Sequence, residues 1–265
     1  MTDIDKNNTS FKDYAKYYDL LYQDKNYQEE ANYVHTLIQT HKPRAKSILS
    51  LGCGTGRYEY ELEKLGYTIT GVDISKQMID IACSRYKSDN CTFIHEDIRT
   101  IRLDKRFDAV ISLFHVMCYQ TENKDLINAF KTAEIHLRTN GIFIFDFWHG
   151  TAVLNNPPYI KEKFIENKDI SILRKTSPTL HPVKNIVEVN FDINIIEKTT
   201  GIKHSVKEQH NMRYLFLPEL KKISELSSMR FLTNRKWMEL DIQITNNTWY
   251  GLAIFTKWKQ KEKKY

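Results

Sequence analysis

Three glycines, each separated by one residue, follow a short apolar run near the start of the chain. Residues 47–51 are Ser-Ile-Leu-Ser-Leu, and Gly52, Gly54 and Gly56 come directly after them. An apolar run of this length, followed by glycines and then a helical pattern, predicts a buried parallel strand that turns into a helix. Glycine permits positive φ and lets a ligand approach the backbone closely. We therefore expect a cofactor site at the carboxyl end of a first strand.

Carboxylates follow the next two predicted strands. Asp73 closes a strand at 67–72, and Asp97 follows one at 91–95. Asp73 can accept hydrogen bonds from both hydroxyls of a ribose, or it can cap the following helix beside Ser75. Taken alone, the residue leaves both roles open, and the glycine loop in front of it favours the ligand role. Asp97 likewise has the alternative of a turn carboxylate.

Histidines follow two later strands. His115 comes after a predicted strand at 107–114, and His149 after one at 142–147. Imidazole can accept a proton near neutral pH, so both are candidate catalytic bases. The alternative for each is a histidine that makes only a structural hydrogen bond at a strand end.

The elements that must position these residues alternate regularly. Helical patterns at about 57–65, 75–86 and 122–138 separate the strands, and a helix at 218–229 and strands at 231–238 and 249–258 follow later. Such alternation predicts an α/β fold whose parallel sheet is covered on both faces, with ligands at the carboxyl ends of the strands.

After residue 150 the pattern changes. Residues 186–196 alternate strictly between apolar and polar side chains, which is typical of a half-exposed antiparallel strand. Neighbouring runs at 163–174 and 203–215, with a turn at Thr200-Gly201, complete a small antiparallel sheet. We expect a tyrosine-rich helical cap at 1–43, an α/β domain at 44–150 and 216–265, and an antiparallel insertion at 151–215 that forms a substrate lid.

The glycine spacing also separates two families of cofactor-binding proteins. The run is GxGxG, whereas dinucleotide-binding folds use GxGxxG. Leu51-Gly-Cys-Gly-Thr-Gly56 resembles the first motif of the class I S-adenosylmethionine-dependent methyltransferases, and the resemblance covers residues 47–147. It implies a Rossmann-like sheet with an antiparallel β insertion after strand five, S-adenosyl-L-methionine as cofactor and S-adenosyl-L-homocysteine as product.

The resemblance also implies roles for individual residues. The glycine loop passes beneath the methionine part of the cofactor, Asp73 binds the ribose, Asp97 faces the adenine amino group, and Ile98 packs on the adenine ring. The family often carries an acidic residue where this chain has Ser50, so we expect weaker polar support for the loop. The full set of expected cofactor contacts is Tyr18, Tyr22, Tyr27, Gly52, Cys53, Gly54, Gly56, Asp73, Ile74, Met78, Asp97, Ile98 and Leu113.

A narrower resemblance concerns the acceptor. The N-terminal Tyr18-Asp19 and Tyr22, the segment 27–31 and the insertion are similar to bacterial methyltransferases of the desosamine N,N-dimethyltransferase type, which act on nucleotide-linked amino sugars. Similar chains with a segment like residues 211–216 accompany polysaccharide-building enzymes, so the resemblance also implies a sugar-like substrate. The resemblance implies a small-molecule acceptor with an amine or a hydroxyl, such as a nucleotide sugar or glycan precursor. The alternatives are an RNA or protein methyltransferase and a non-catalytic cofactor-binding or NAD-binding protein.

Composition narrows the partners further. The net charge of +6 is mild, and much of it lies in the last nine residues. We expect this basic tail to be solvated, because no basic stripe interleaved with aromatic residues accompanies it. The tetrapeptide Asn156-Pro-Pro-Tyr159 matches a motif of nucleic-acid and protein amino-methyltransferases, but it follows strand five instead of strand four, so we expect a turn and no nucleic-acid partner.

The remaining expectations concern location and assembly. No apolar run is long enough for a membrane span, and the four cysteines show no metal or disulfide spacing, so we expect a cytoplasmic protein without a metal site. The sequence does not determine the oligomeric state, and a homodimer is left open.

Overall fold

The computed structural model describes residues 15–258. Two parts of the sequence prediction lie outside the described residues. One is the start of the N-terminal helical cap, including Tyr14. The other is most of the basic tail, with Lys259, Lys261, Lys263 and Lys264.

A seven-stranded sheet with the order β10-β11-β5-β4-β1-β2-β3 forms the centre of the molecule. Strands β1 to β5 pair in parallel, whereas β11 is antiparallel to both β5 and β10. The α/β fold class is confirmed, and the two later strands, whose direction the sequence left open, add an antiparallel edge to the parallel part of the sheet. The bounds are β1 (Ser47–Leu51), β2 (Thr68–Asp73), β3 (Cys91–His95), β4 (Phe107–Ser112), β5 (Leu137–Trp148), β10 (Met229–Lys236) and β11 (Tyr250–Lys257).

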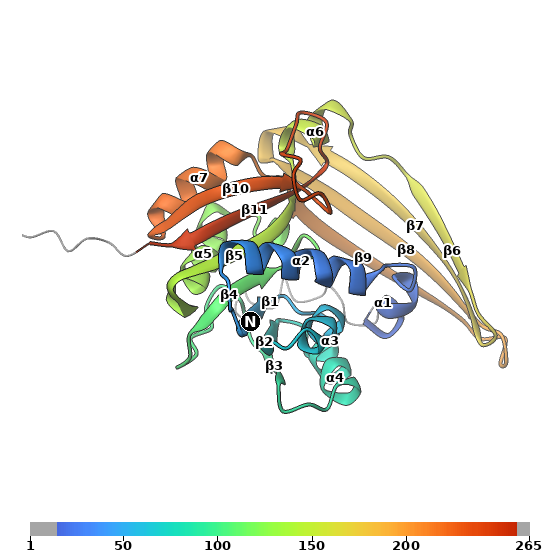
Figure 1. The fold of residues 1–265 in the computed structure, drawn as a ribbon. Helices are drawn as coiled ribbons and strands as arrows, with labels where there is room; N and C mark the ends of the chain where they lie inside the picture. The colour runs from blue at the N-terminus through green and yellow to red at the C-terminus, as the bar shows by residue number, and fades with distance from the viewer. Residues whose placement is uncertain (1–14, 259–265) are drawn as a thin grey trace, which may run out of the picture.

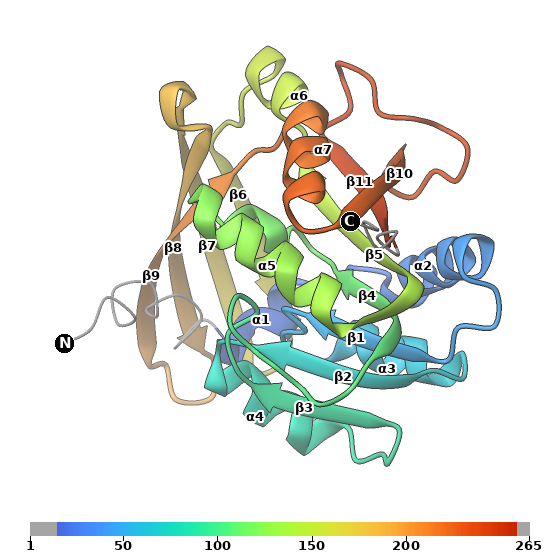
Figure 2. The same cartoon turned by 90° about the vertical axis from the view of Figure 1, so that its left-hand side faces the viewer.

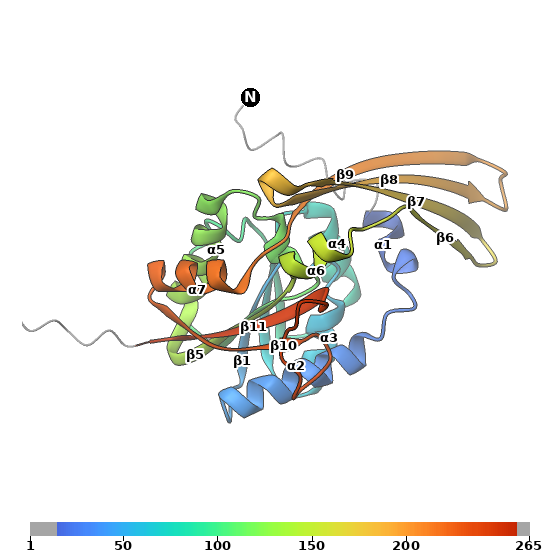
Figure 3. The same cartoon turned by 90° about the horizontal axis from the view of Figure 1, so that it is seen from above.

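Helices cover both faces of this sheet (Figure 3). Helices α2 (Tyr27–His41) and α3 (Arg57–Lys64) lie on one face, and α5 (Asn123–His136) and α7 (Leu217–Leu226) on the other. Successive strand residues point to opposite faces, so Ile142 and Ile144 of β5 join the core under α2 and α3, while Phe143 and Phe145 pack with α5. A further helix, α4 (Lys76–Arg85), follows β2, and the side chain of Ser75 caps its N-terminus as expected.

Strand β4 ends two residues earlier than predicted. Phe114 and His115 have φ angles of 65° and 64°, which are incompatible with a strand. The chain then enters the short 3-10 helix η1 (Val116–Tyr119). Two consecutive non-glycine residues in the left-handed region cost on the order of 1–3 kcal/mol each, and such strain is concentrated at functional sites.

The insertion forms a four-stranded antiparallel sheet with the order β6-β7-β8-β9. Figure 1 shows it extending from the α/β part as a long curved wing. The predicted strand at 163–174 was wrong, because it joins the end of β6, a turn and the start of β7 into one element. The bounds are α6 (Gly150–Asn155), β6 (Lys161–Glu166), β7 (Ile170–His181), η2 (Pro182–Lys184), β8 (Ile186–Glu197) and β9 (Lys203–Arg213).

Helix α1 (Ala15–Leu21) fills the angle between the wing and the carboxyl ends of the central strands (Figure 2). Its buried residues Tyr17 and Leu21 pack on Ile172, Ile193 and Ile195 of the wing. These three isoleucines share one face of the antiparallel sheet, so that face points toward the α/β part. We call it the inner face below.

Candidate functional site

The glycine loop is fixed to the neighbouring strand by its backbone. The amides of Gly52 and Cys53 both donate to the carbonyl of Val72, at 2.7 and 3.0 Å. All three glycines have positive φ, and a Cβ added to Gly52 would come within 2.5 Å of Val116. A Cβ on Gly54 would meet nothing within 4 Å. The middle of the loop therefore faces open space, where a ligand can reach the backbone.

Asp73 joins this loop to the next strand. One carboxylate oxygen accepts from the amide of Gly54 and the other from the amide of Ser75, both at 2.8 Å. Burial raises the pKa of Asp73, and these amide hydrogen bonds oppose the rise. Each oxygen keeps a further lone pair, so the carboxylate can also accept from a pair of vicinal hydroxyls. Of the two roles that the sequence left open for Asp73, the side-chain cap of α4 is made by Ser75, and ribose binding stays a prediction.

Asp97 lies beyond the end of β3 and is held by Arg99. The guanidinium donates to both carboxylate oxygens and also reaches Asp125 at 3.0 Å. The amide of Arg99 also donates to Asp97, which is the turn arrangement expected as the alternative. A carboxylate fixed in this way has a defined direction and can still accept a hydrogen bond from an exocyclic amine.

The apolar residues expected around an adenine differ in exposure. Ile74, directly after Asp73, is 39% exposed, whereas Met78, Ile98 and Leu113 are 2%, 7% and 4% exposed. Ile74 therefore offers most of the apolar surface at this edge. The other three belong mainly to the core, as does Cys53, which is 7% exposed.

The three expected tyrosines do not come together. Tyr18 and Tyr22 pack on each other with ring centroids 4.8 Å apart, and Tyr22 contacts Phe114 at the end of β4. Tyr27 instead lies in the core between α2 and α3, beside Tyr58. We therefore leave Tyr27 out of the cofactor contacts proposed below.

Asp19 of α1, which lies between Tyr18 and Tyr22 in the sequence, connects that helix to the glycine loop. Its carboxylate accepts from the hydroxyl of Thr55 at 2.8 Å and forms an ion pair with Arg85 of α4. The cap that the sequence predicted thus has a specific attachment to the loop between Gly54 and Gly56.

The loop also has polar support from below. The hydroxyl of Ser50 donates to Oε1 of Glu59 at 2.5 Å, and these residues are 3% and 1% exposed. Burial raises the pKa of Glu59 to about 7. The expectation that Ser50 leaves the loop with weaker support was therefore incomplete, because α3 supplies a carboxyl group from its first turn.

His115 forms a pair with Asp146, a residue that the sequence analysis did not single out. Its Nδ1 lies 2.7 Å from Oδ2 of Asp146, although not in the direction of an aligned hydrogen bond. The backbone amide of His115 donates to the same carboxylate at 3.1 and 3.2 Å. The imidazole also stacks on Tyr250, with centroids 5.1 Å apart. Asp146 thus holds both the strained backbone and the ring of His115, and Nδ1 faces the carboxylate.

His149 occupies a different environment. It is 6% exposed, precedes α6, and packs its ring edge to face against Phe147. Burial lowers the pKa of His149, and backbone groups of Thr245 and Thr248 oppose this. No contact joins the imidazoles of His115 and His149 within residues 15–258. Of the two candidate bases, the structure brings only His115 together with a carboxylate.

A second histidine and carboxylate pair comes from the wing and was not found from the sequence. His210 and Glu208 of β9 lie on the inner face, with Nε2 of the imidazole 3.0 Å from a Glu208 oxygen. Nδ1 of His210 lies 2.8 Å from the hydroxyl of Tyr119 in η1. The alternation of β9 places Glu208 and His210 on one face, but only the fold shows that this face meets η1.

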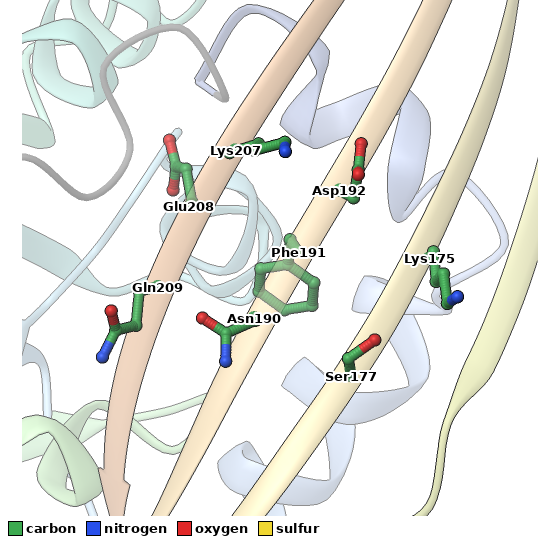
Figure 4. Close-up of a pocket in the computed structure, with 8 residues that line it drawn as sticks. All are labelled: Lys175, Ser177, Asn190, Phe191, Asp192, Lys207, Glu208 and Gln209. Atoms are coloured by element: carbon green, nitrogen blue, oxygen red, sulfur yellow. The ribbon is translucent and has the colours of Figure 1, made fainter.

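The opposite face of the wing carries a shallow pocket (Figure 4). Strands β7, β8 and β9 form it, and its outward-facing side chains include two lysines and Asp192, whereas the side chains of Phe191 and Glu208 belong to the inner face. The lining residues are Lys175, Ser177, Asn190, Phe191, Asp192, Lys207, Glu208 and Gln209.

Three further observations concern metal ligands, membrane-spanning helices and the Asn-Pro-Pro-Tyr segment. In the part of the chain that the structure describes, no group of three histidine, cysteine or acidic residues is arranged to hold a metal. Over the same residues, no helix has the length and apolarity needed to cross a membrane. Tyr159 of the Asn-Pro-Pro-Tyr segment is 66% exposed in the connection between α6 and β6.

Comparisons with known proteins agree with this geometry. A family model described as a methyltransferase domain matches residues 48–141. A Streptomyces fradiae dTDP-3-amino-3,6-dideoxy-alpha-D-glucopyranose N,N-dimethyltransferase is 26% identical over 179 residues, which are 67% of this chain and 69% of that one. The Bacillus subtilis protein YqeM, assigned as a methyltransferase, is 30% identical over 181 residues, 63% of this chain and 72% of that one.

A solved structure extends the likeness to almost the whole chain. An S-adenosylmethionine-dependent methyltransferase from Clostridium acetobutylicum superimposes with a TM-score of 0.78 at 17% identity. The alignment covers 93% of this chain and 98% of that one. The fold, including the antiparallel wing, is therefore shared at low sequence identity.

Proposed function

The chain belongs to the class I S-adenosylmethionine-dependent methyltransferases, and from this premise we propose that it methylates the amino group of a nucleotide-linked sugar. The observation that carries the enzyme class is the glycine loop joined to Asp73 at the carboxyl ends of β1 and β2. The amino sugar rests on the likeness to the Streptomyces dimethyltransferase. A hydroxyl of a similar sugar or glycan precursor is the second candidate acceptor.

We propose that the cofactor lies along the ends of β1, β2 and β3. The backbone at Gly54 is open to its methionine part, Asp73 accepts from the ribose hydroxyls, and Ile74 and Asp97 contact the adenine. Three observations support this assignment: the open space over Gly54, the remaining lone pairs of Asp73 and the exposed Ile74. When bound, the cofactor supplies an electrophilic methyl group on a sulfonium.

We propose that the acceptor lies between α1, the inner face of the wing and the ends of β4 and β5. Tyr22, Phe114 and Tyr250 supply aromatic surface there, and Arg174 of β7 donates to the hydroxyl of Tyr22 at 3.2 Å. Residues 151–215 would then act as the lid of this site. A small acceptor fits such a site better than a folded RNA, which needs an extended basic surface.

The residues of the chain have two tasks in this reaction. They must hold the nucleophile in line with the methyl group at roughly 3–3.5 Å, and they must accept the proton that the nucleophile loses. We propose His115 for the second task when the acceptor is a hydroxyl, because Asp146 fixes its ring and can stabilise the imidazolium. An amine that arrives neutral needs only to be positioned.

A methyl-transfer screen over amino-bearing and hydroxyl-bearing nucleotide sugars, read by mass spectrometry, tests this proposal. Calorimetry with S-adenosylhomocysteine and NAD in parallel tests the cofactor independently. Binding of NAD alone would remove the assigned cofactor site, and salt-dependent RNA binding with methylated RNA would favour the nucleic-acid alternative.

A further inference from the structure

Tyr119, His210 and Glu208 form a continuous polar chain between the α/β part and the wing. The hydroxyl of Tyr119 and Nδ1 of His210 are 2.8 Å apart, and Nε2 of His210 and Glu208 are 3.0 Å apart. His210 and Glu208 are 2% and 8% exposed. Phe191 packs against the imidazole with centroids 5.0 Å apart, so the ring has little freedom to turn.

The hydrogen bonds that link Tyr119, His210 and Glu208 have a definite donor-to-acceptor direction. A carboxylate can only accept hydrogen bonds, so Glu208 requires the proton of neutral His210 to be on Nε2. Nδ1 then carries the lone pair, and the phenol of Tyr119 donates to it. Burial raises the pKa of Tyr119 well above its usual range. The tyrosine therefore keeps its own proton at neutral pH, and the basic atom at the end of the chain is Nδ1 of His210.

Tyr119 also lies next to the proposed site. The helix η1 that carries it begins beside the glycine loop, because the side chain of Val116 lies against Gly52. The side chain of Tyr119 is only half-buried, in contrast to those of His210 and Glu208. Tyr119 thus connects the helix beside the glycine loop to His210 of the wing.

We propose that Tyr119 passes the proton of the acceptor's ammonium group to His210, so that the wing supplies the proton acceptor for amine methylation. This inference rests on the proposed function. Aliphatic amines are largely protonated at neutral pH, and an ammonium nitrogen has no lone pair with which to attack.

The step balances in protons and electrons. The ammonium N–H bond breaks and its proton binds the phenolic oxygen, while the phenolic proton moves to Nδ1 of His210. The resulting imidazolium is stabilised by Glu208, and the nitrogen keeps the electron pair of the broken N–H bond. That pair then forms the bond to the methyl carbon, and the electron pair of the methyl–sulfur bond goes to sulfur. Tyr119 is the catalytic residue in this account, and His210 and Glu208 are positioning residues.

Two histidines of β9 allow a matched experiment. His210→Asn keeps an oxygen that can accept from Tyr119 but cannot take up a proton, and Tyr119→Phe removes the relay hydroxyl. His204 lies on the same strand and contacts Glu197 at 3.4 Å with its side chain 44% exposed, so His204→Asn is the control. Each variant is compared with wild type in methylation of a dTDP-amino sugar between pH 6 and 9, and in calorimetric binding of S-adenosylhomocysteine.

We expect Tyr119→Phe and His210→Asn to lower kcat by about 100-fold at pH 6.5, the lower end of the effect of general bases. The loss shrinks as pH rises, because more of the amine then arrives neutral. Affinity for S-adenosylhomocysteine stays within about twofold of wild type, as it does in His204→Asn. In ¹⁵N-histidine spectra at pH 8, wild-type His210 carries its proton on Nε2.

A loss that is equal at every pH, or that is matched by weaker S-adenosylhomocysteine binding, would show a structural role and overturn the relay. A proton on Nδ1 of His210 at pH 8 would overturn it without any acceptor being needed. If wild type methylates hydroxyl sugars but no amine, the relay and the proposed amine acceptor both fail. If wild type methylates the amine and the variants match His204→Asn, the relay alone fails.

Discussion

The hydroxyl of Ser50 donates to the buried carboxyl of Glu59 at 2.5 Å, directly beneath the glycine loop. The second oxygen of Glu59 has no hydrogen-bond partner among residues 15–258. Asp73 is the charged neighbour that raises the pKa of Glu59 further, whereas Ser50 and the backbone lower it. The loop is therefore supported by a carboxyl group whose pKa lies near neutral pH, and Ser50 is its hydrogen-bond donor.

Glu59 should make stability depend on pH. Its pKa rises from 4.5 to about 7 on folding, so the folded chain binds more protons in this interval and loses stability as pH rises through it. The loss amounts to about 3 kcal/mol at full ionisation. Glu59→Gln should match wild type near pH 5 and exceed it near pH 8, as measured by denaturant unfolding at both values.

Glu61→Gln is the matched control, because Glu61 lies on the same helix and forms an ion pair with Lys64, whose side chain is half exposed. It should leave the pH dependence unchanged. Equal pH slopes for wild type and Glu59→Gln would show that Glu59 ionises normally in the folded protein.

Asp73→Asn should weaken binding of S-adenosylhomocysteine. A hydrogen bond to a charged group contributes about 1.5–3 kcal/mol, so we expect a loss of roughly 10-fold to 100-fold. Asp80→Asn on α4, whose exposed carboxylate pairs with Lys76, is the control and should bind normally. Calorimetry measures both, and unchanged affinity in a folded Asp73→Asn protein would remove Asp73 from the cofactor site.

Asp19→Ala should release α1 from the loop. The variant loses the hydrogen bond to Thr55 and a partly exposed ion pair with Arg85, so global stability should fall by no more than about 1–2 kcal/mol. Affinity for S-adenosylhomocysteine should fall about fivefold. Asp24→Ala breaks a contact of the same region with Lys163 without touching the loop. If both variants bind the product equally well, α1 does not contribute to the cofactor site.

His115 and Asp146 should act as one unit with a hydroxyl acceptor. Each single variant, His115→Ala or Asp146→Asn, should lower kcat by at least about 100-fold. The double variant should lose no more kcat than the single variant with the larger loss. Turnover assays of the three proteins test this, with His181→Asn on β7, whose side chain is 41% exposed, as control. Additive losses, or no loss in any of the variants, would show that the pair does not function as a base.

The glycine spacing and the strand ends predicted the α/β part because they are local signals. Gly52, Gly54 and Asp73 lie within one βαβ unit, and the structure joins them by the backbone hydrogen bonds that such a unit requires. The reversed strand β11 carries no local sign of its direction, since its pairing with β5 depends on residues about 100 positions apart.

The acceptor side was harder to predict for the same reason. Asp146 lies within a strand, and its contact with His115 depends on two positive φ values that the residue types do not signal. Tyr119 and His210 are 91 residues apart and meet only because the wing folds back over η1. No sequence feature distinguishes Tyr27 from Tyr18 and Tyr22. Tyr27 is buried because of its position on α2.

The central claim is tested most directly by incubating the protein with S-adenosylmethionine and dTDP-3-amino-3,6-dideoxyglucose and measuring the mass of the sugar nucleotide. We expect the mass gain of one or two methyl groups, with formation of S-adenosylhomocysteine in the same molar amount. An unmethylated amino sugar, from a protein that binds S-adenosylhomocysteine and methylates a different class of acceptor, would contradict the account.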